Sequence, residues 1–531
     1  MKRHRSGYFA ALLSAAVLSA SCVGDLNTTP KSPEEITTEQ VYADPDNYIN
    51  VLAKIYGSLA LTGQQGGAGR PDIQGIDEGN SGFLRLLFDL QELPTDEAVF
   101  TWSDGSIKDL HRMSWLPTSE YVTSFYYRLY YTISIANEFL RETTEARLTA
   151  RNIPQERWAE IDAYRNESRF IRAMCYWQLC DAFGSAPYVD ENSAVGTSNF
   201  PVQYTRQQLF EYVEKEMTDA ATRLPDPRTN AYGRVDKASA WMLLAKLYLN
   251  AEIYVGQPRY TDCIACCRQI INAGYSLDPV YQHLFLADNQ NSPEIIFPIQ
   301  FDGMKTQSYG GLSFVVNSAI GSGMNPADYG VSGGWNSLRT TSKLVTKFSD
   351  PTGATDKRAI FFSQGRSLVV NNIDEPTDGY AVVKYKNKTS TGQDGSNKEF
   401  VDIDFPFFRL GDVYLMFAEA VVRGGTGATL GEAVYYVNEL RQRAYGDTSG
   451  NIAEGDLTLD FLIDERAREL YWECTRRTDL IRFGLFTTDR YLWDWKGDVP
   501  GGRAVEDKYN LYPIPSSDLV SNPNLKQTPG Y

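Results

Sequence analysis

The sequence predicts a mostly α-helical protein. Tetratricopeptide-like pairs of helices form its scaffold, joined by long glycine- and aromatic-rich loops and a few short β-strands. Three segments carry apolar residues at the spacing i, i+3, i+4, i+7, namely 170–177, 241–248 and 414–421. This spacing indicates helices that each bury one face. Two stretches, 62–118 and 285–405, do not fit this pattern of helical pairs and are rich in Gly, Asn, Ser, Asp and aromatic residues.

The second apolar segment begins a helix–turn–helix pattern. A Gly-Gln-Pro turn at 256–258 follows it, and a further helical pattern runs from Tyr260 to Ala273 and ends at Gly274. Trp, Leu-Ala and Tyr on the first helix, with Ala265 on the second, resemble a tetratricopeptide hairpin. Residues 121–143 with 160–183, and 411–423 with 430–443, are predicted to form similar pairs. Such pairs cannot bury their apolar faces alone, so we expect them to stack into a scaffold over about 120–275 and 405–485.

The two remaining stretches are predicted to be loop regions. Within 285–405 the only β-type runs are short, such as Glu294–Pro298 and Ala381–Tyr385. Long loops inside a compact domain are uncommon and usually functional. We therefore expect the functional residues on 62–118 and 285–405, held in place by the helical frame.

The N-terminus has the composition of an export signal. Lys2, Arg3 and Arg5 precede a short apolar run at 8–20, which is too short to span a membrane. Small residues directly before Cys22 resemble a bacterial lipobox, in which this cysteine becomes lipidated. The sequence thus predicts a removed signal peptide at 1–21, a polar lipid-anchored tether at 22–40 and a single domain at 41–531. A plain secreted protein with a chance cysteine is the alternative.

Composition and charge exclude several classes of protein. The 531 residues are 42% apolar and 22% charged, as in ordinary globular proteins. The net charge is −16, and removal of Lys2, Arg3 and Arg5 with the leader would bring it to −19. An acidic surface repels phosphate backbones, so no nucleic-acid partner is expected.

Enzyme motifs are weak. Residues 330–334 satisfy the G-x-S-x-G pattern, but that motif needs a preceding strand, a following helix and a histidine base. The flanks do not fit, and the mature chain offers only His111 and His283. A glycosidase needs two carboxylates about 5–10 Å apart. Four acids are near one another in sequence and keep a surface glycosidase as the alternative from a different class: Glu92, Asp96, Glu97 and Asp104. We predict a protein that is not an enzyme.

Three large aromatic residues stand on glycine-rich loops without apolar periodic neighbours. They are Trp102, Tyr309 and Trp335. A flat ring offers contact area at little entropic cost, and its face suits the apolar C–H face of a pyranose. Neighbouring polar side chains can then bind the sugar hydroxyls. The alternative is that the three rings pack inward as loop anchors.

Several motifs carry a resemblance to a known family. They are 169–173 followed by Tyr176-Trp177, 465–470 with 476–484, and the closing 512–515 and 522–525. Together with the leader that ends in Cys22, they resemble the SusD/RagB family of surface lipoproteins over essentially the whole chain. The stretches 62–64, 77–79, 92–97, 305–311 and 491–497 are similar to those of a starch-binding member.

The resemblance implies a set of binding residues. An aromatic arc that cups the helical curve of an α-glucan would be formed by Trp102, Tyr309 and Trp335, supported by Arg85. Asp104 is counted with them, although the family's Asn in this loop has no clear counterpart. The family's calcium ion would be held by Asp402 and Asp404; no other cofactor is expected.

The resemblance also implies a function and partners. The expected protein binds starch or malto-oligosaccharides without cleaving them, at the outer membrane and facing the cell exterior. It would deliver them to a SusC-like TonB-dependent barrel, alongside other surface glycan-binding lipoproteins and amylases. The alternatives within this class are a binder of a different glycan and a purely structural subunit of the transporter without sugar affinity.

Overall fold

A computed structural model describes residues 37–194, 196 and 200–531, so the predicted leader and Cys22 lie outside the described residues. Its α-helices are α2 (Thr38–Ala43), α3 (Asn47–Gly57), α4 (Phe83–Glu92), α5 (Ile107–Arg112), α6 (Glu120–Glu142), α7 (Glu145–Ala150), α8 (Trp158–Ala182), α9 (Arg206–Arg223), α10 (Lys237–Leu249), α11 (Ala251–Val255), α12 (Tyr260–Ile271), α13 (Leu312–Ala319), α14 (Ser342–Val345), α15 (Leu410–Val422), α16 (Leu430–Tyr445), α17 (Leu459–Leu470), α18 (Arg476–Arg482) and α19 (Ser516–Ser521). None of the helices in this part of the chain is both long and apolar enough to cross a membrane.

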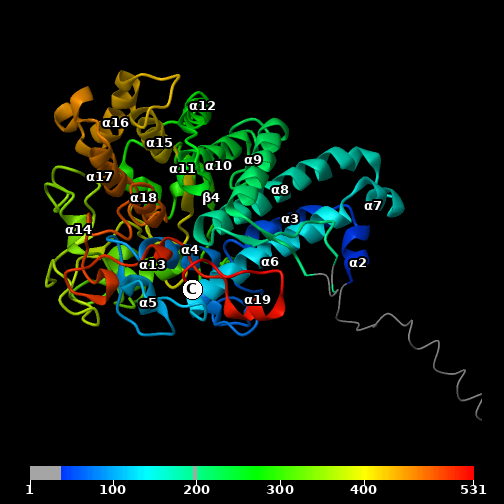
Figure 1. Cartoon of the computed structure of the whole chain (residues 1–531), viewed down its shortest axis with the longest axis horizontal. Helices are drawn as coiled ribbons and strands as arrows, with labels where there is room; N and C mark the ends of the chain where they lie inside the picture. The colour runs from blue at the N-terminus through cyan, green and yellow to red at the C-terminus, as the bar shows by residue number, and fades with distance from the viewer. Residues whose placement is uncertain (1–36, 195, 197–199) are drawn as a thin grey trace, which may run out of the picture.

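The long helices pack side by side in chain order. α6 lies along α8, α8 along α9, α9 along α10, α10 along α12, α12 along α15 and α15 along α16. Figure 1 shows most of this series as the upper layer, with α5, α13, α14 and α19 below it. The predicted fold class is confirmed, as is the pairing of 121–143 with 160–183 and of 411–423 with 430–443.

Polar side chains fix where the scaffold helices begin. Thr205 and Thr429 each form a reciprocal capping box with the side chain three residues later, at the start of α9 and α16. Asp236 accepts hydrogen bonds from the backbone of Ala238 (2.8 Å) and Ser239 (3.2 Å) at the start of α10. Each cap satisfies backbone N–H groups that have no partner inside the helix.

The two predicted loop regions contain helices, which corrects the prediction for 62–118 and 285–405. All ten residues of α4 are buried, including Arg85, Asp89 and Glu92, and all eight residues of α13 are buried as well. Both helices carry apolar residues at the spacing i, i+3, i+4, i+7, at 83, 86, 87 and 90 and at 312, 315, 316 and 319. They are only ten and eight residues long, so the signal covers little more than two turns inside a glycine-rich region.

The strands are short and pair only two by two within the described residues. They are β1 (Val99–Phe100), β2 (Ala186–Pro187), β3 (Gln203–Tyr204), β4 (Ile295–Ile299), β5 (Leu338–Arg339), β6 (Phe361–Phe362), β7 (Ala381–Val382) and β8 (Phe405–Arg409). The antiparallel pairs are β1·β5, β2·β3, β4·β8 and β6·β7. Two of them join segments far apart in the sequence: β1·β5 joins the two loop regions to each other, and β4·β8 joins the region 285–405 to the segment that leads into α15.

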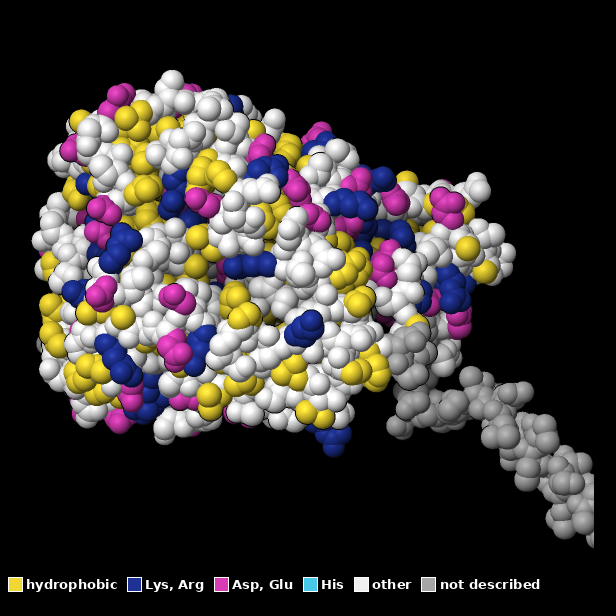
Figure 2. All heavy atoms as spheres, in the orientation of Figure 1, with side chains coloured by type: hydrophobic (Ala, Val, Ile, Leu, Met, Phe, Trp, Pro, Cys, Tyr) yellow, Lys and Arg dark blue, Asp and Glu magenta, His cyan; other side chains and the backbone are white. Residues whose placement is uncertain are grey.

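A buried group of charged side chains fastens the region 285–405 to the C-terminal helices. We call it the C-terminal ion cluster; its members are Glu294, Arg358, Lys384, Arg409, Arg443, Glu465, Glu469 and Glu473, with side chains at most 4% exposed. Arg409, at the end of β8, contacts Glu294 (2.8 Å), Glu469 (2.7 Å) and Glu473 (2.6 Å). On the face shown in Figure 2, basic and acidic side chains are scattered among one another.

Candidate functional site: an aromatic arc

The pairing of β1 with β5 brings two of the predicted site residues together. Val99 pairs with Arg339 and Phe100 with Leu338, and the Thr101 N–H then donates to the Ser337 carbonyl at 3.1 Å. Trp102 follows Thr101, two residues beyond the end of β1, and therefore reaches the loop that carries Trp335. The centroids of the two indole rings lie 6.0 Å apart, with their planes inclined by 33°.

The segment around Trp335 lies tightly against the end of α13. The Trp335 N–H donates to the Asn317 carbonyl at 2.7 Å, and the Asn336 N–H donates to the Ile320 carbonyl at 2.9 Å. A Cβ added at Gly334 would approach the Ile320 carbonyl oxygen to 2.2 Å. Glycine is thus needed before the indole because two backbones approach closely, and the indole is held in one place.

Tyr309 completes the group of three rings. Its ring centroid lies 5.8 Å from that of Trp335 at an interplanar angle of 62°, and 5.2 Å from that of Phe400. The phenol donates a hydrogen bond to the Glu399 carboxylate, and this bond is the main reason that the pKa of Tyr309 is raised to about 12. The hydroxyl therefore remains protonated at neutral pH and fixes the orientation of the ring.

Trp102, Tyr309 and Trp335 are half-buried, and together they form what we call the aromatic arc. A second layer of rings supports it: Phe100 lies 5.3 Å from Trp102, and Phe314 lies 6.4 Å from Trp335. The arc residues are therefore packed on the core and still partly exposed. The rings thus pack inward on one side, as the loop-anchor alternative expects. Their other side stays partly exposed, as sugar binding requires.

Arg85 lies beneath the arc and is only 5% exposed. Its guanidinium is 4.1 Å from the centroid of the Phe314 ring, and it donates to the Gly79 carbonyl at 2.8 Å. Arg85 therefore supports the arc through Phe314. Asp104 has the opposite surroundings: it is exposed in the loop after Trp102, and its carboxylate forms no hydrogen bond with a described residue.

Asp89 is the buried partner of Arg85 and provides a prediction about pH. Among the described residues its carboxylate accepts no hydrogen bond, and Arg85 Nε lies 3.7 Å away. Burial raises the pKa of Asp89 from 3.8 to about 7, although Arg85 opposes the shift. A carboxyl with a raised pKa in the folded state destabilises the fold as the pH rises from about 4 to about 7.

We therefore expect Asp89→Asn to stabilise the protein at pH 8. The gain in the free energy of unfolding over wild type should be up to about 4 kcal/mol larger at pH 8 than at pH 4. Thermal melts at the two pH values check this expectation. The Asn substitution removes the ionisable group and keeps the shape of the side chain. Equal effects of the substitution at both pH values would contradict a raised pKa at Asp89.

Glu78 is a supporting residue that the sequence did not single out by itself. It is 3% exposed and accepts hydrogen bonds from the Ser308 hydroxyl (2.7 Å), the Ala68 N–H (3.2 Å) and the Tyr309 N–H (3.4 Å). A single buried carboxylate thus joins the loop 62–72 to the segment of Tyr309. Two adjacent acids in a glycine-rich stretch are typical of solvent-exposed loops, so only the resemblance at 77–79 pointed to this position.

Asp402 and Asp404, the expected calcium ligands, line one open pocket. Asp402 accepts from the Gly303 N–H (2.7 Å) and the Ser396 hydroxyl (2.7 Å), and Asp404 accepts from the Tyr232 hydroxyl (2.7 Å). Calcium takes about six to eight oxygen ligands, and carboxylates suit it chemically. The described residues, however, form no group of three or more acidic, His or Cys side chains placed to hold a metal. The calcium ion stays a prediction.

The candidate catalytic groups are enclosed, with one exception. Glu92, Asp96 and Glu97 are at most 1% exposed, and Asp96 pairs with Arg476 at 2.7 Å. They join the segment before β1 to the segment around α18. Among the four acids of the glycosidase alternative, only Asp104 faces solvent. Both ring nitrogens of His111 are bound by backbone carbonyls, at 2.8 and 2.9 Å.

Two family descriptions match parts of the chain. Residues 357–531 match the family described as "SusD family", and residues 79–249 match the family described as "Starch-binding associating with outer membrane". The chain is 35% identical to the starch-binding protein SusD of Bacteroides thetaiotaomicron, over 99% of this chain and 100% of that protein. It is 24% identical to SusD-like protein P2 of Formosa agariphila, over 81% of this chain and 84% of that protein.

Solved structures share the fold at low sequence identity. The surface glycan-binding protein A of Bacteroides thetaiotaomicron, solved with laminarihexaose, aligns with a TM-score of 0.67 at 19% identity, over 91% of this chain and 99% of that chain. A laminarin-binding SusD-like protein aligns with a TM-score of 0.68 at 20% identity, over 92% and 99% of the two chains. These likenesses show the architecture.

Proposed function

Because the chain belongs to the SusD/RagB family, we propose that it binds starch and malto-oligosaccharides at the cell surface without cleaving them. The aromatic arc is the observation that carries this proposal. Three partly exposed rings from distant segments are held together on a layer of buried rings. The full-length likeness to a protein named for starch binding supports the choice of ligand.

The shape of the arc favours a curved glucan. Its neighbouring ring planes are inclined by 33° between Trp102 and Trp335 and by 62° between Trp335 and Tyr309. Rings inclined in this way cannot all lie flat against a straight ribbon such as a β-1,4-glucan. A helical α-1,4-glucan changes direction from one sugar to the next and can present a sugar face to each ring.

Calorimetric titration with maltoheptaose, cellohexaose and laminarihexaose tests this proposal. We expect affinity for maltoheptaose at least tenfold above that for cellohexaose, because a straight β-1,4 chain cannot follow the inclined rings. Laminarihexaose, a curved β-1,3 chain, shows whether curvature alone is enough for binding. Equal affinity for maltoheptaose and cellohexaose would contradict the starch assignment. The protein would then be a family member that binds a different glycan.

The enzyme alternative has a simple test. Incubation with maltoheptaose followed by chromatography is expected to return the intact sugar, because three of the four candidate carboxylates are enclosed. Products above background that disappear on substitution of Asp104 would replace the binding function with a glycosidase. Absence of any sugar affinity would leave the structural-subunit alternative.

We also propose that lipidated Cys22 anchors the protein to the outer membrane and that the protein delivers sugar to a SusC-like TonB-dependent barrel. The leader motif and the family description that mentions the outer membrane support this location. Antibody labelling of intact cells should detect the protein, and a barrel should co-purify with it. Labelling only after lysis would place the protein on the inner side and exclude delivery from the surface.

A further inference from the structure

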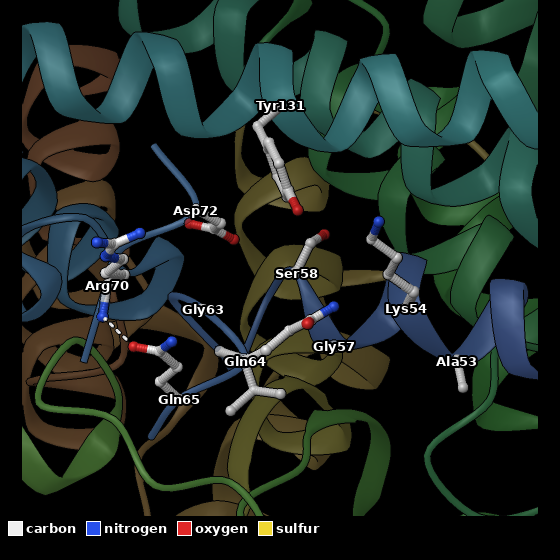
Figure 3. A pocket seen from close by; sticks show the side chains of 11 residues that line it. Ala53, Lys54, Gly57, Ser58, Gly63, Gln64, Gln65, Arg70, Asp72 and Tyr131 are labelled. Atoms are coloured by element: carbon white, nitrogen blue, oxygen red, sulfur yellow. Dashed lines mark hydrogen bonds between the residues drawn. The ribbon is translucent and has the colours of Figure 1, made fainter. Parts of the chain in front are cut away.

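A cavity of about 370 Å³ lies between α3, α6 and the loop 62–72 (Figure 3). We call it the α3 pocket. Its lining residues are Ala53, Lys54, Gly57, Ser58, Leu61, Gly63, Gln64, Gln65, Arg70, Asp72 and Tyr131. Small-molecule sites usually measure about 300–1,000 Å³, so the volume suits a ligand of one or two rings. None of the expected binding residues lines this cavity.

The lining offers both donors and acceptors. Tyr131 extends from α6 into the cavity, with its hydroxyl directed toward Ser58 and Asp72 (Figure 3). Lys54 supplies an ammonium group and Gln64 supplies a side-chain amide. A sugar hydroxyl both donates and accepts hydrogen bonds, so it needs a mixed lining of this kind. A purely cationic or purely apolar pocket would favour a different class of ligand.

Asp72 is held in a fixed orientation. Its carboxylate accepts two hydrogen bonds from the Arg128 guanidinium, at 2.9 and 2.6 Å. Arg128 is itself completely buried and donates a further bond to the Ser81 carbonyl at 2.6 Å. A carboxylate oriented before binding loses little entropy when a ligand arrives. The Asp72 side chain remains 16% exposed and keeps acceptor capacity for that ligand.

Other polar groups of the lining are free to bind. Neither the Lys54 ammonium nor the Gln64 side-chain amide forms a hydrogen bond with any residue in the described part of the chain, and Arg70 forms no ion pair there. A ligand hydroxyl would therefore replace only water at these groups. No existing protein contact has to break.

The loop that forms one wall of the α3 pocket also reaches the aromatic arc. Gly63 and Gln64 line the cavity at the base of the loop, whereas Gly67 lies against Tyr309. A Cβ at Gly67 would come within 3.2 Å of the Tyr309 ring and 2.6 Å of the Phe400 ring. Glycine is needed here because the loop packs directly on the two rings, so one loop lies against the arc at Gly67 and lines the α3 pocket at Gly63 and Gln64.

We propose that the α3 pocket is a second carbohydrate subsite. It takes one or two sugar units of the α-glucan chain whose neighbouring part lies on the aromatic arc. The proposal rests on the proposed function and extends it to the length of glycan that is recognised. Long chains engage both places, whereas a short oligosaccharide fills only one.

The first test removes polar groups from the pocket without filling it. In Gln64→Ala/Tyr131→Phe, an amide and a hydroxyl are lost while the Tyr131 ring is kept. We expect affinity for short-chain amylose to fall about tenfold and affinity for maltotriose, which the arc alone can hold, to stay unchanged. The matched control is Gln74→Ala/Tyr435→Phe, which alters an exposed Gln outside the pocket and a Tyr that is 57% exposed. Amylose affinity equal to that of the control would overturn the proposal.

The second test separates the subsite from the arc. In Trp102→Ala/Trp335→Ala, we expect saturation-transfer NMR with excess maltotriose to detect residual weak binding. Adding Gln64→Ala/Tyr131→Phe should abolish this signal. One outcome is that wild type binds glucan while Trp102→Ala/Trp335→Ala gives no saturation-transfer signal that the pocket substitutions remove. That result would refute the second subsite and leave the proposed function intact. If wild type shows no glucan binding at all, both are wrong.

Discussion

Replacement of Trp102 or Trp335 by alanine is expected to weaken the binding of maltoheptaose at least tenfold. Stacking of a planar ligand on an aromatic side chain contributes about 1–3 kcal/mol in nucleic-acid complexes, which corresponds to about ten- to hundredfold in affinity. Both indoles are preorganised, Trp102 on Phe100 and Trp335 by the bonds of its segment to α13. Calorimetry with each variant measures the loss.

Tyr309 provides the graded comparison. Tyr309→Ala should weaken binding less than either Trp substitution, because a phenol offers a smaller face. Tyr309→Phe keeps the ring and loses only the bond to Glu399, so it serves as the matched control. All three alanine variants should melt close to wild type, because the helical pairs carry most of the fold. Early melting, with folded protein that still binds sugar, would mean that these rings are anchors.

Arg409→Met is expected to destabilise the protein by about 3–5 kcal/mol. The guanidinium contacts Glu294, Glu469 and Glu473 in the C-terminal ion cluster, and these carboxylates are at most 4% exposed. Removing one member of a buried ion pair leaves charge without compensation, which costs far more than losing an exposed pair. Urea unfolding followed by circular dichroism gives the change in the free energy of unfolding.

A substitution in an exposed ion pair is the control for this measurement. Arg223 pairs with Asp219 at 2.9 Å, and its side chain is 53% exposed. Arg223→Met should therefore cost at most about 1 kcal/mol. If Arg409→Met were as mild as Arg223→Met, the C-terminal ion cluster would not hold the region 285–405 to the C-terminal helices.

The helical scaffold could be predicted from the sequence because its helices are long and carry the apolar spacing over several turns. Segments 170–177 and 414–421 lie in helices of 25 and 13 residues and show this spacing, although nearly every residue in both segments is buried. The helix α4 has the same spacing at 83, 86, 87 and 90 but is only ten residues long, and its polar residues Arg85 and Asp89 are as buried as its leucines, which the spacing does not predict. Their partners come from elsewhere in the fold, and a single-sequence pattern does not contain them.

The sequence predicts which residues bind the ligand, but it does not predict how they are arranged in space. Large rings on glycine-rich loops pointed to Trp102, Tyr309 and Trp335, and the structure brings them together. The layer beneath them depends on a ladder of two residues per strand, which is too short to leave a pattern in the sequence. The α3 pocket was missed for a related reason: Lys54, Asp72 and Tyr131 come from three separate elements.

The β1·β5 pairing has a consequence for the time at which the protein becomes competent to bind. It joins Phe100 to Leu338, and Asp96, just before β1, pairs with Arg476 of α18. Contacts between residues so distant in the chain form slowly, because much of the chain has to be ordered first. The arc therefore assembles only once Phe100 and Leu338 have come together, which requires both loop regions to be in place. Under the proposed function, a chain that ends before residue 338 would not bind glucan, so sugar binding would report that both loop regions have folded.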